Sequence, residues 1–330
     1  MGLYEEMTPG IFRICQEVRK GWIPFTMNLY ALPGTAGLLF DAGSGARGAV
    51  TYAARALDAL EKERGTRVRR ILPSHAHWDH FSGTSALAKR RRMEVLLTEA
   101  MVPLVRTRAC YRAAYQERKS ALHPPRSRGR EAMRNLKDRL IDEAFSLSMG
   151  LQAVTGPFSL LCVGDHVESE AGTWEVLAGP GHCDAHIMLW NASSGILLGG
   201  DNVLANITTW LGPPRSNITA YQTTLETIRD LPGLTLILPA HGRPITDPIK
   251  RTTQLIAHRK KRLAQIKEKV AAAGPQGLSG RALVQHYYPH MAPLKRSIAQ
   301  GWIEATLLHL LEEGELSRTL EKGLWCYHRR

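Results

Sequence analysis

The sequence predicts an α+β protein built as an αββα sandwich, with a helical insertion and a small C-terminal domain. Short apolar segments typical of strands alternate with helix-forming segments along residues 1–247. Histidine and aspartate residues follow directly after several of these predicted strands. A basic, helix-rich remainder begins at residue 248, so we expect a second domain over residues 248–330.

The elements of the sandwich are predicted in order from apolar runs and from the turn residues that end them. Pro33-Gly34 predicts a turn between two early strands. The expected helices cover residues 49–64 and 83–92. The expected strands cover residues 10–14, 27–32, 37–40, 69–72, 94–98, 172–177, 185–190, 195–198 and 234–238.

The most informative motif comes immediately after the predicted strand that ends at Leu72. Pro73-Ser74 breaks this strand, so the motif is expected on a loop at the edge of the sheet. Three histidines and one aspartate then fall within six residues: His75, His77, Asp79 and His80. On an extended loop, the first two point to one side, and the last two can face a second point nearby. Imidazole and carboxylate ligands suit zinc, and iron or manganese become alternatives as oxygen ligands increase.

This H-x-H-x-D-H pattern resembles the signature of the metallo-β-lactamase-fold hydrolases. Three further motifs follow in the order that this family shows, each at the end of an apolar segment: G-P-G-H at 179–182, L-G-G-D at 198–201 and L-P-A-H-G at 238–242. The resemblance implies that His75, His77 and His182 surround one metal ion. It implies that Asp79, His80 and His241 surround a second ion, and that Asp201 bridges the two.

The resemblance also implies the chemistry. Two divalent ions, with zinc preferred over iron or manganese, would share a water and make it available as a bridging hydroxide at neutral pH. Asp79 would be the catalytic residue that binds the second ion and orients the hydroxide. Asp41, in an Asp-x-Gly turn, matches a position that usually supports a ligand. No serine nucleophile motif of the G-x-S-x-G type is present, and Cys183 is expected to be a buried thiol.

Composition narrows the class of protein. A chain of 330 residues with 44% hydrophobic content can bury a large core. No apolar run approaches the roughly 18–20 residues that span a bilayer, so no membrane association is expected. Five scattered cysteines and an N-terminus unlike a signal peptide favour a cytoplasmic protein. The formal net charge of +13 keeps nucleic acid as a candidate substrate.

The segment 100–156 is predicted to be a helical insertion, broken at Pro124-Pro125 and rich in arginine. Its basic residues suit either two solvated helix faces or a cap over the metal cleft that attracts an anionic substrate. The apolar residues at 144–149 could line the pocket under such a cap.

The C-terminal residues predict a winged-helix-like domain. A long helix at 249–273 is followed by a helix that Ser279 caps, by an apolar stripe at 303–311 and by a hairpin at 316–327. DNA binding is not favoured, because the helix that would enter the major groove carries Glu304, Glu312 and Glu313. A packing role, or a role in forming a homodimer, is the preferred interpretation.

Three classes of function agree with these observations. The favoured one is a thioesterase or acyl hydrolase acting on an acyl-CoA, acyl-carrier or acylglutathione-type thioester, because an insertion could cover an acyl chain. The alternative is an endoribonuclease acting on single-stranded RNA, or a lactonase. A signalling protein that kept the fold without turnover is disfavoured by the full ligand set.

Overall fold

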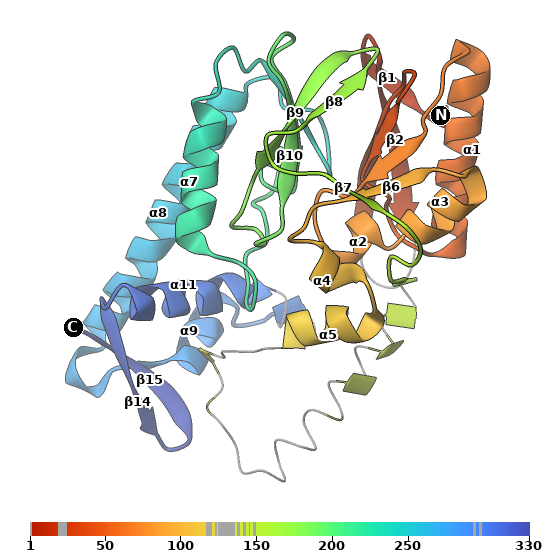
Figure 1. The fold of residues 1–330 in the computed structure, drawn as a ribbon. Coiled ribbons are helices and arrows are strands. Elements are labelled where there is room, and N and C mark those ends of the chain that lie inside the picture. Colours follow the sequence, from red (N-terminus) through yellow and green to blue (C-terminus); the bar gives the residue numbers. More distant parts are fainter. Residues whose placement is uncertain are drawn as a thin grey trace.

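The computed structural model describes residues 2–18, 25–116, 150–292 and 299–330, together with shorter pieces at 121–122, 124, 136, 139–140, 143–144, 146–147 and 295–296. Two β-sheets pack face to face, and helices cover the outer face of each sheet (Figure 1). The predicted αββα sandwich is therefore confirmed.

The first sheet contains seven strands within the described residues, and neighbours in the sheet follow chain order. Pairing is antiparallel from β1 to β4 and parallel from β4 to β7. Helices α1 (Arg47–Arg64) and α3 (Thr84–Arg91) connect parallel strands on the outer face. The strands are β1 (Glu5–Thr8), β2 (Ile11–Val18), β3 (Phe25–Leu32), β4 (Leu38–Phe40), β5 (Arg70–Leu72), β6 (Glu94–Leu97) and β7 (Ser159–Leu160).

The second sheet has five strands in the part of the chain that the structure describes, ordered β12-β11-β10-β9-β8. Only the pair β11 and β12 is parallel, joined through α7 (Ile218–Arg229). Helices α7 and α8 (Pro248–Ala272) cover its outer face (Figure 1). The strands are β8 (His166–Ser169), β9 (Gly172–Ala178), β10 (Ile187–Asn191), β11 (Ile196–Gly200) and β12 (Leu236–Pro239).

The burial of each strand follows from its place between layers. Along β3, Met27 and Leu29 pack towards α1, whereas Tyr30 and Leu32 pack into the core between the two sheets. This alternation is the period of two that a pleated strand imposes. Every residue of β10 is buried, because both of its faces are covered.

The C-terminal residues form helices and a small antiparallel sheet. After α8 come α9 (Gly280–Tyr287) and α11 (Gly301–Glu312). A hairpin of β14 (Leu316–Glu321) and β15 (Leu324–Arg329) follows, and β13 (Leu278–Ser279) pairs with β15 as the third strand of this sheet. The Ser279 hydroxyl accepts a hydrogen bond from the backbone N–H of Ala282, so the predicted helix cap is confirmed. The name winged helix remains a prediction for this arrangement.

Helix α8 belongs to both parts of the molecule. Leu255 and Ile256 pack with Leu225 of α7 on the sandwich, whereas Ile266 and Val270 pack with the C-terminal helices and sheet. The division at residue 247 therefore falls at the start of a helix that spans both cores.

The structure differs from the expectation in several elements. The one-turn helix α2 (Trp78–Phe81) holds Asp79 and His80, which the sequence placed on a loop. Helix α7 and the short strands β1, β7, β8 and β13 were not predicted. The insertion contains α4 (Val102–Val105) and α5 (Arg108–Gln116). Pro125 of its predicted break and half of its apolar segment, residues 145, 148 and 149, lie outside the described residues.

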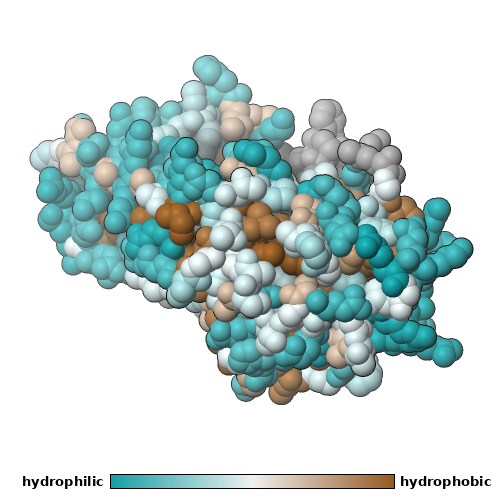
Figure 2. Space-filling model, turned by 90° about the horizontal axis from the view of Figure 1, so that it is seen from above, coloured by the Kyte–Doolittle hydropathy of each residue, from teal (hydrophilic) through white to brown (hydrophobic). Residues whose placement is uncertain are grey.

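Figure 2 shows the molecule from above the view of Figure 1. This face is mainly hydrophilic, with small hydrophobic areas near its middle. Among the described residues, no helix is both long enough and apolar enough to cross a bilayer.

Candidate metal centre

All the predicted site residues follow the carboxyl ends of strands, at one end of the sandwich. The motif at 75–80 follows β5, His182 follows β9, Asp201 follows β11 and His241 follows β12. The parallel pairs in each sheet place these ends at a common edge, because parallel strands end on the same side. The structure brings all seven residues together there, in two adjacent groups.

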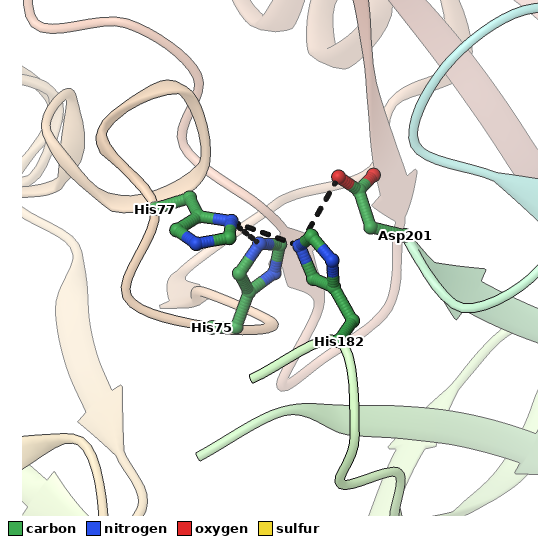
Figure 3. Close-up of side chains that lie close together, drawn as sticks. All are labelled: His75, His77, His182 and Asp201. Atoms are coloured by element: carbon green, nitrogen blue, oxygen red, sulfur yellow. Dashed lines mark hydrogen bonds and ion pairs between the residues drawn. The ribbon is translucent and has the colours of Figure 1, made fainter. Parts of the chain in front are cut away.

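The first group contains three imidazoles and one carboxylate. The Nδ1 atom of His77 lies 2.9 Å from Nε2 of His75 and 2.8 Å from Nε2 of His182. The carboxylate of Asp201 lies 3.6 Å from Nε2 of His182. These side chains converge towards one point, His75 and His77 from one loop, and His182 and Asp201 from two other segments (Figure 3). Their four candidate ligand atoms all lie within 4.8 Å of one another.

The second group contains Asp79, His80 and His241. Oδ2 of Asp79 lies 3.4 Å from Nε2 of His241 and 3.9 Å from Nε2 of His80. Oδ1 of Asp201 lies 3.6 Å from His80 and 3.4 Å from His241, while its Oδ2 faces the first group. Asp201 therefore stands between the two groups, where a bridging ligand would have to be.

Hydrogen bonds fix which imidazole nitrogen faces each group. Nδ1 of His182 lies 2.8 Å from the carbonyl oxygen of Trp210, and Nδ1 of His241 lies 2.6 Å from that of Thr26. Because a carbonyl only accepts, Nδ1 must donate in both cases. In the neutral ring, Nε2 is then the nitrogen without a hydrogen, and this atom faces the candidate ligands of its group.

Asp41 performs the same task for His80. Its Oδ2 lies 3.0 Å from Nδ1 of His80, and its Oδ1 accepts a 2.7 Å hydrogen bond from the backbone N–H of Ser74. The residue has φ of 67°, a left-handed conformation that costs free energy for an aspartate. This strained turn thus supports both the start of the motif loop and the ring of His80.

His186 is a member of the site that the sequence analysis missed. It is buried, its ring stacks on that of His75 at 4.8 Å, and its Nε2 accepts a 3.1 Å hydrogen bond from the backbone N–H of Asp201. It therefore orients two predicted ligands without joining either group. Its position four residues after His182 was the only signal for it in the sequence.

Burial and mutual charge set the protonation of the site. Burial, with smaller effects from neighbouring histidines, lowers the pKa of His75 far below its ordinary value and that of His77 to about 3. Burial also lowers the pKa of His182. These three rings are neutral at pH 7, which is the state that binds a metal ion.

In the second group, the charges of neighbouring side chains outweigh the effect of burial on the pKa values. Burial lowers the pKa of His241, but the nearby carboxylates of Asp201 and Asp79 outweigh burial and raise it to about 9. Burial raises the pKa of the Asp201 carboxyl, but His241 and His80 hold it well below its ordinary value. The carboxylates are thus ionised, and protons on imidazoles supply the positive charge that a metal ion would replace.

The residues fit a pair of divalent ions of the zinc or iron type. Nε2 of His80 and Oδ1 of Asp201 are buried, and neither atom has a hydrogen-bond partner among the described residues. Buried polar atoms are rarely left in this state, and both atoms lie where the two groups meet. A ligand set of imidazoles and carboxylates suits zinc and iron.

The insertion reaches this centre through α5. The hydroxyl of Tyr115 donates to the carbonyl oxygen of Ala76, and its ring lies 5.7 Å from that of His77. Residues 121–122 pack instead into the C-terminal core, where the Ala121 backbone N–H donates to Glu304. The insertion thus extends from the metal-loop motif to the C-terminal elements.

Some predicted features of the insertion have other roles or lie outside the described residues. Arg108 and Arg112 pair with Glu143, and Arg106 donates to the carbonyl oxygens of Val154 and Gly156. Arg126, Arg128 and Arg130 lie outside the described part of the chain. Cys183 is buried as expected, and burial raises the pKa of its thiol.

Comparison with known proteins identifies the family. A family model described as the metallo-beta-lactamase superfamily matches residues 25–241, a span that contains all seven residues of the two groups. The chain belongs to the metallo-beta-lactamase superfamily.

Curated relatives match over shorter stretches. The protein named probable metallo-hydrolase YqjP of Bacillus subtilis is 40% identical over 81 residues, which cover 22% of this chain and 25% of that protein. The beta-lactamase-like protein 2 homolog of Caenorhabditis elegans is 33% identical over 103 residues, 31% of this chain and 33% of that protein. The chain thus matches between a quarter and a third of the length of these relatives.

Solved structures resemble the whole chain. A metallo-beta-lactamase family protein from Thermus thermophilus has a TM-score of 0.73 and 24% identity, with 98% of this chain and 100% of that chain covered. A beta-lactamase domain protein from Burkholderia ambifaria has a TM-score of 0.76 and 23% identity, with 99% and 93% covered. At this identity the similarity establishes the fold alone, and it extends through the C-terminal elements.

Proposed function

We propose that the protein is a dinuclear metal-dependent hydrolase that cleaves thioesters whose leaving group is anionic, as in acyl-CoA, acyl-carrier or acylglutathione-type substrates. The observation that carries the hydrolase proposal is the pair of adjacent ligand groups that share Asp201. A relative that matches part of the chain is itself named a probable metallo-hydrolase.

The ligand sets assign each ion its residues. His75, His77, His182 and Asp201 would hold one ion, and Asp79, His80, His241 and Asp201 would hold the other. When bound, two divalent ions supply a water that is acidic enough to ionise near neutral pH, and they polarise the substrate carbonyl. Asp41, Trp210 and Thr26 hold the imidazole rings in the required orientation.

Asp79 has a second task in this proposal. Burial raises the pKa of its carboxyl, but His80 and His241 outweigh burial, so the group is ionised. The residue is only partly buried, so water can reach its carboxylate. An ionised carboxylate there can accept a hydrogen bond from the attacking water and orient it towards the carbonyl carbon.

One feature supports an anionic leaving group. Arg243 lies two residues after His241, is exposed, and forms no ion pair within the described ranges. A guanidinium at this position can bind a phosphate or carboxylate of the carrier.

The test is a hydrolysis screen of the metal-loaded protein. Acyl-CoA, acylglutathione, lactone, cephalosporin and single-stranded RNA substrates are compared under one condition. We expect thioesters to give the highest kcat/KM and a chelator to abolish it. Preferential cleavage of any other class would reject the thioester proposal.

An endoribonuclease is the second candidate. The net charge of +13 favours it, because a basic surface attracts a polyanion regardless of sequence. The RNA arm of the screen, repeated at higher salt, tests it, because RNA cleavage should then fall steeply.

A further inference from the structure

One irregular segment lies beside both ligand groups. It covers residues 203–211, between β11 and α7. Near its start, Asn206 accepts a hydrogen bond from Arg243, which follows His241 by two residues. Near its end, the carbonyl oxygen of Trp210 accepts from His182, and the Trp210 indole lies 6.2 Å from the His77 ring. The segment therefore forms one rim of the metal centre.

Two large apolar side chains on this rim are exposed. Ile207 is 62% exposed and Trp210 is 42% exposed, whereas Val203, Leu204 and Leu211 of the same segment are buried. Exposed apolar groups beside a polar centre are typical of a surface that binds the apolar part of a ligand.

The rim is held rigidly by helix α8. Arg251 donates to the carbonyl oxygens of Leu204 and Ile207, both at 2.7 Å. Arg259, which is only 5% exposed, donates to the carbonyl oxygen of Thr209 at 2.7 Å. These bonds replace the regular backbone pairing that the segment lacks. The exposed side chains are thus presented on a backbone that is fixed before any ligand arrives.

The indole of Trp210 also packs closely against two glycines. A Cβ atom added to Gly212 would lie 2.3 Å from its ring, and one added to Gly301 would lie 3.0 Å from its Nε1 atom, so a larger residue at either position would crowd the indole. Gly301 is the first residue of α11, so the C-terminal part of the chain supports a side chain beside His77.

We infer that Ile207 and Trp210 form an apolar wall that binds the acyl chain of the substrate, so that the protein prefers medium-length acyl groups to acetyl. This inference rests on the proposed thioesterase function. The occupant is a substrate chain rather than a protein, because the Trp210 ring lies beside His77 and the wall consists of only two side chains, three residues apart on one segment. A stable protein interface instead buries on the order of 800 Å² on each partner.

The test uses thioether analogues that cannot be hydrolysed, so it does not depend on turnover. Binding of S-octylpantetheine and S-methylpantetheine to the metal-loaded protein is measured by calorimetry. Each methylene that the wall buries tightens binding by about fourfold, so we expect a preference for octyl of tenfold or more. Trp210→Ala and Ile207→Ala should each reduce this preference. Leu320→Ala, a change at an equally exposed leucine on β14, is the matched control and should retain it.

Turnover gives the second measurement. The ratio of kcat/KM for octanoyl to acetyl thioesters should fall in both wall variants, mainly through KM. The proposed role of the apolar wall would be rejected if the wild type bound the two analogues equally, or if both variants kept the wild-type preference. If binding depended on chain length but no thioester was hydrolysed, the wall would be supported as a binding surface and the thioesterase function would be rejected.

Discussion

At the scale of single residues, the centre depends on one carboxylate that serves two groups of ligands. Oδ1 of Asp201 faces His80 and His241, and its Oδ2 faces His182. We expect the purified protein to bind close to two metal equivalents. Asp201→Ala should lose about one equivalent and nearly all activity, because each ion loses an anionic ligand.

Metal analysis of both proteins, purified without chelator, checks this prediction. Asp184→Ala is a matched control, because Asp184 lies two residues after His182 and pairs with Arg215 outside both groups. A fully active Asp201→Ala protein would remove the bridging assignment.

Asp79 should matter more for rate than for stability. Its carboxylate is partly exposed on a one-turn helix, so replacement by the equally sized amide leaves the packing intact. Asp79→Asn should lower kcat by two or more orders of magnitude, because a metal ligand and a water-orienting acceptor are lost together. The melting temperature of the metal-free protein should stay near that of the wild type. A parallel fall in activity and melting temperature would show that the residue is structural.

At the scale of elements, α8 is tied to the rim of the centre by its arginines. Arg251→Lys cannot reach both carbonyl oxygens, because an ammonium lacks the forked geometry of a guanidinium. We expect the free energy of unfolding to fall by about 1–3 kcal/mol, as for hydrogen bonds to a charged group. Urea denaturation of the metal-free protein measures this change. Lys250→Gln, at the neighbouring exposed position, should be neutral.

Most regular elements could be predicted because their patterns are local. The apolar spacing of α1 and the cap at Ser279 need only a few neighbouring residues. Helix α7 was missed because it contains four threonines, which have weak helix propensity, and its burial against the sheet supplies the missing stability. The edge strands β7 and β8 are too short to give a periodic signal.

The ligand motifs could be predicted from their spacing, but the residues that orient them could not. His186 acts on Asp201 across the fold, and Arg259 acts on Thr209 from fifty positions away. Such contacts depend on tertiary packing, which leaves no pattern in a single sequence. The sequence also predicts a loop where the one-turn helix α2 carries Asp79, because a helix of four residues gives no periodic signal.

At the scale of the whole molecule, the excess of positive charge should influence substrate capture. A CoA thioester is a polyanion, whereas a short neutral thioester is not. Raising the salt from 50 to 500 mM should raise KM for the first several-fold and leave the second almost unchanged, because salt screens exposed charges over a distance of about 10 Å or less. Steady-state kinetics on both substrates check this prediction. Equal salt effects would show that the charge plays no part in capture.

The arginines of α8 that hold the rim are made after every candidate ligand during synthesis. Every candidate ligand has left the ribosome once residue 241 has emerged, but Arg251, Arg259 and Gly301 are made later. Until then, the rim that receives them has carbonyl oxygens without their donors. A nascent chain can therefore hold all its candidate ligands and still lack a finished centre. The residues that complete the rim are thus made after all the candidate ligands, and metal loading should be most durable once Arg251, Arg259 and Gly301 are in place.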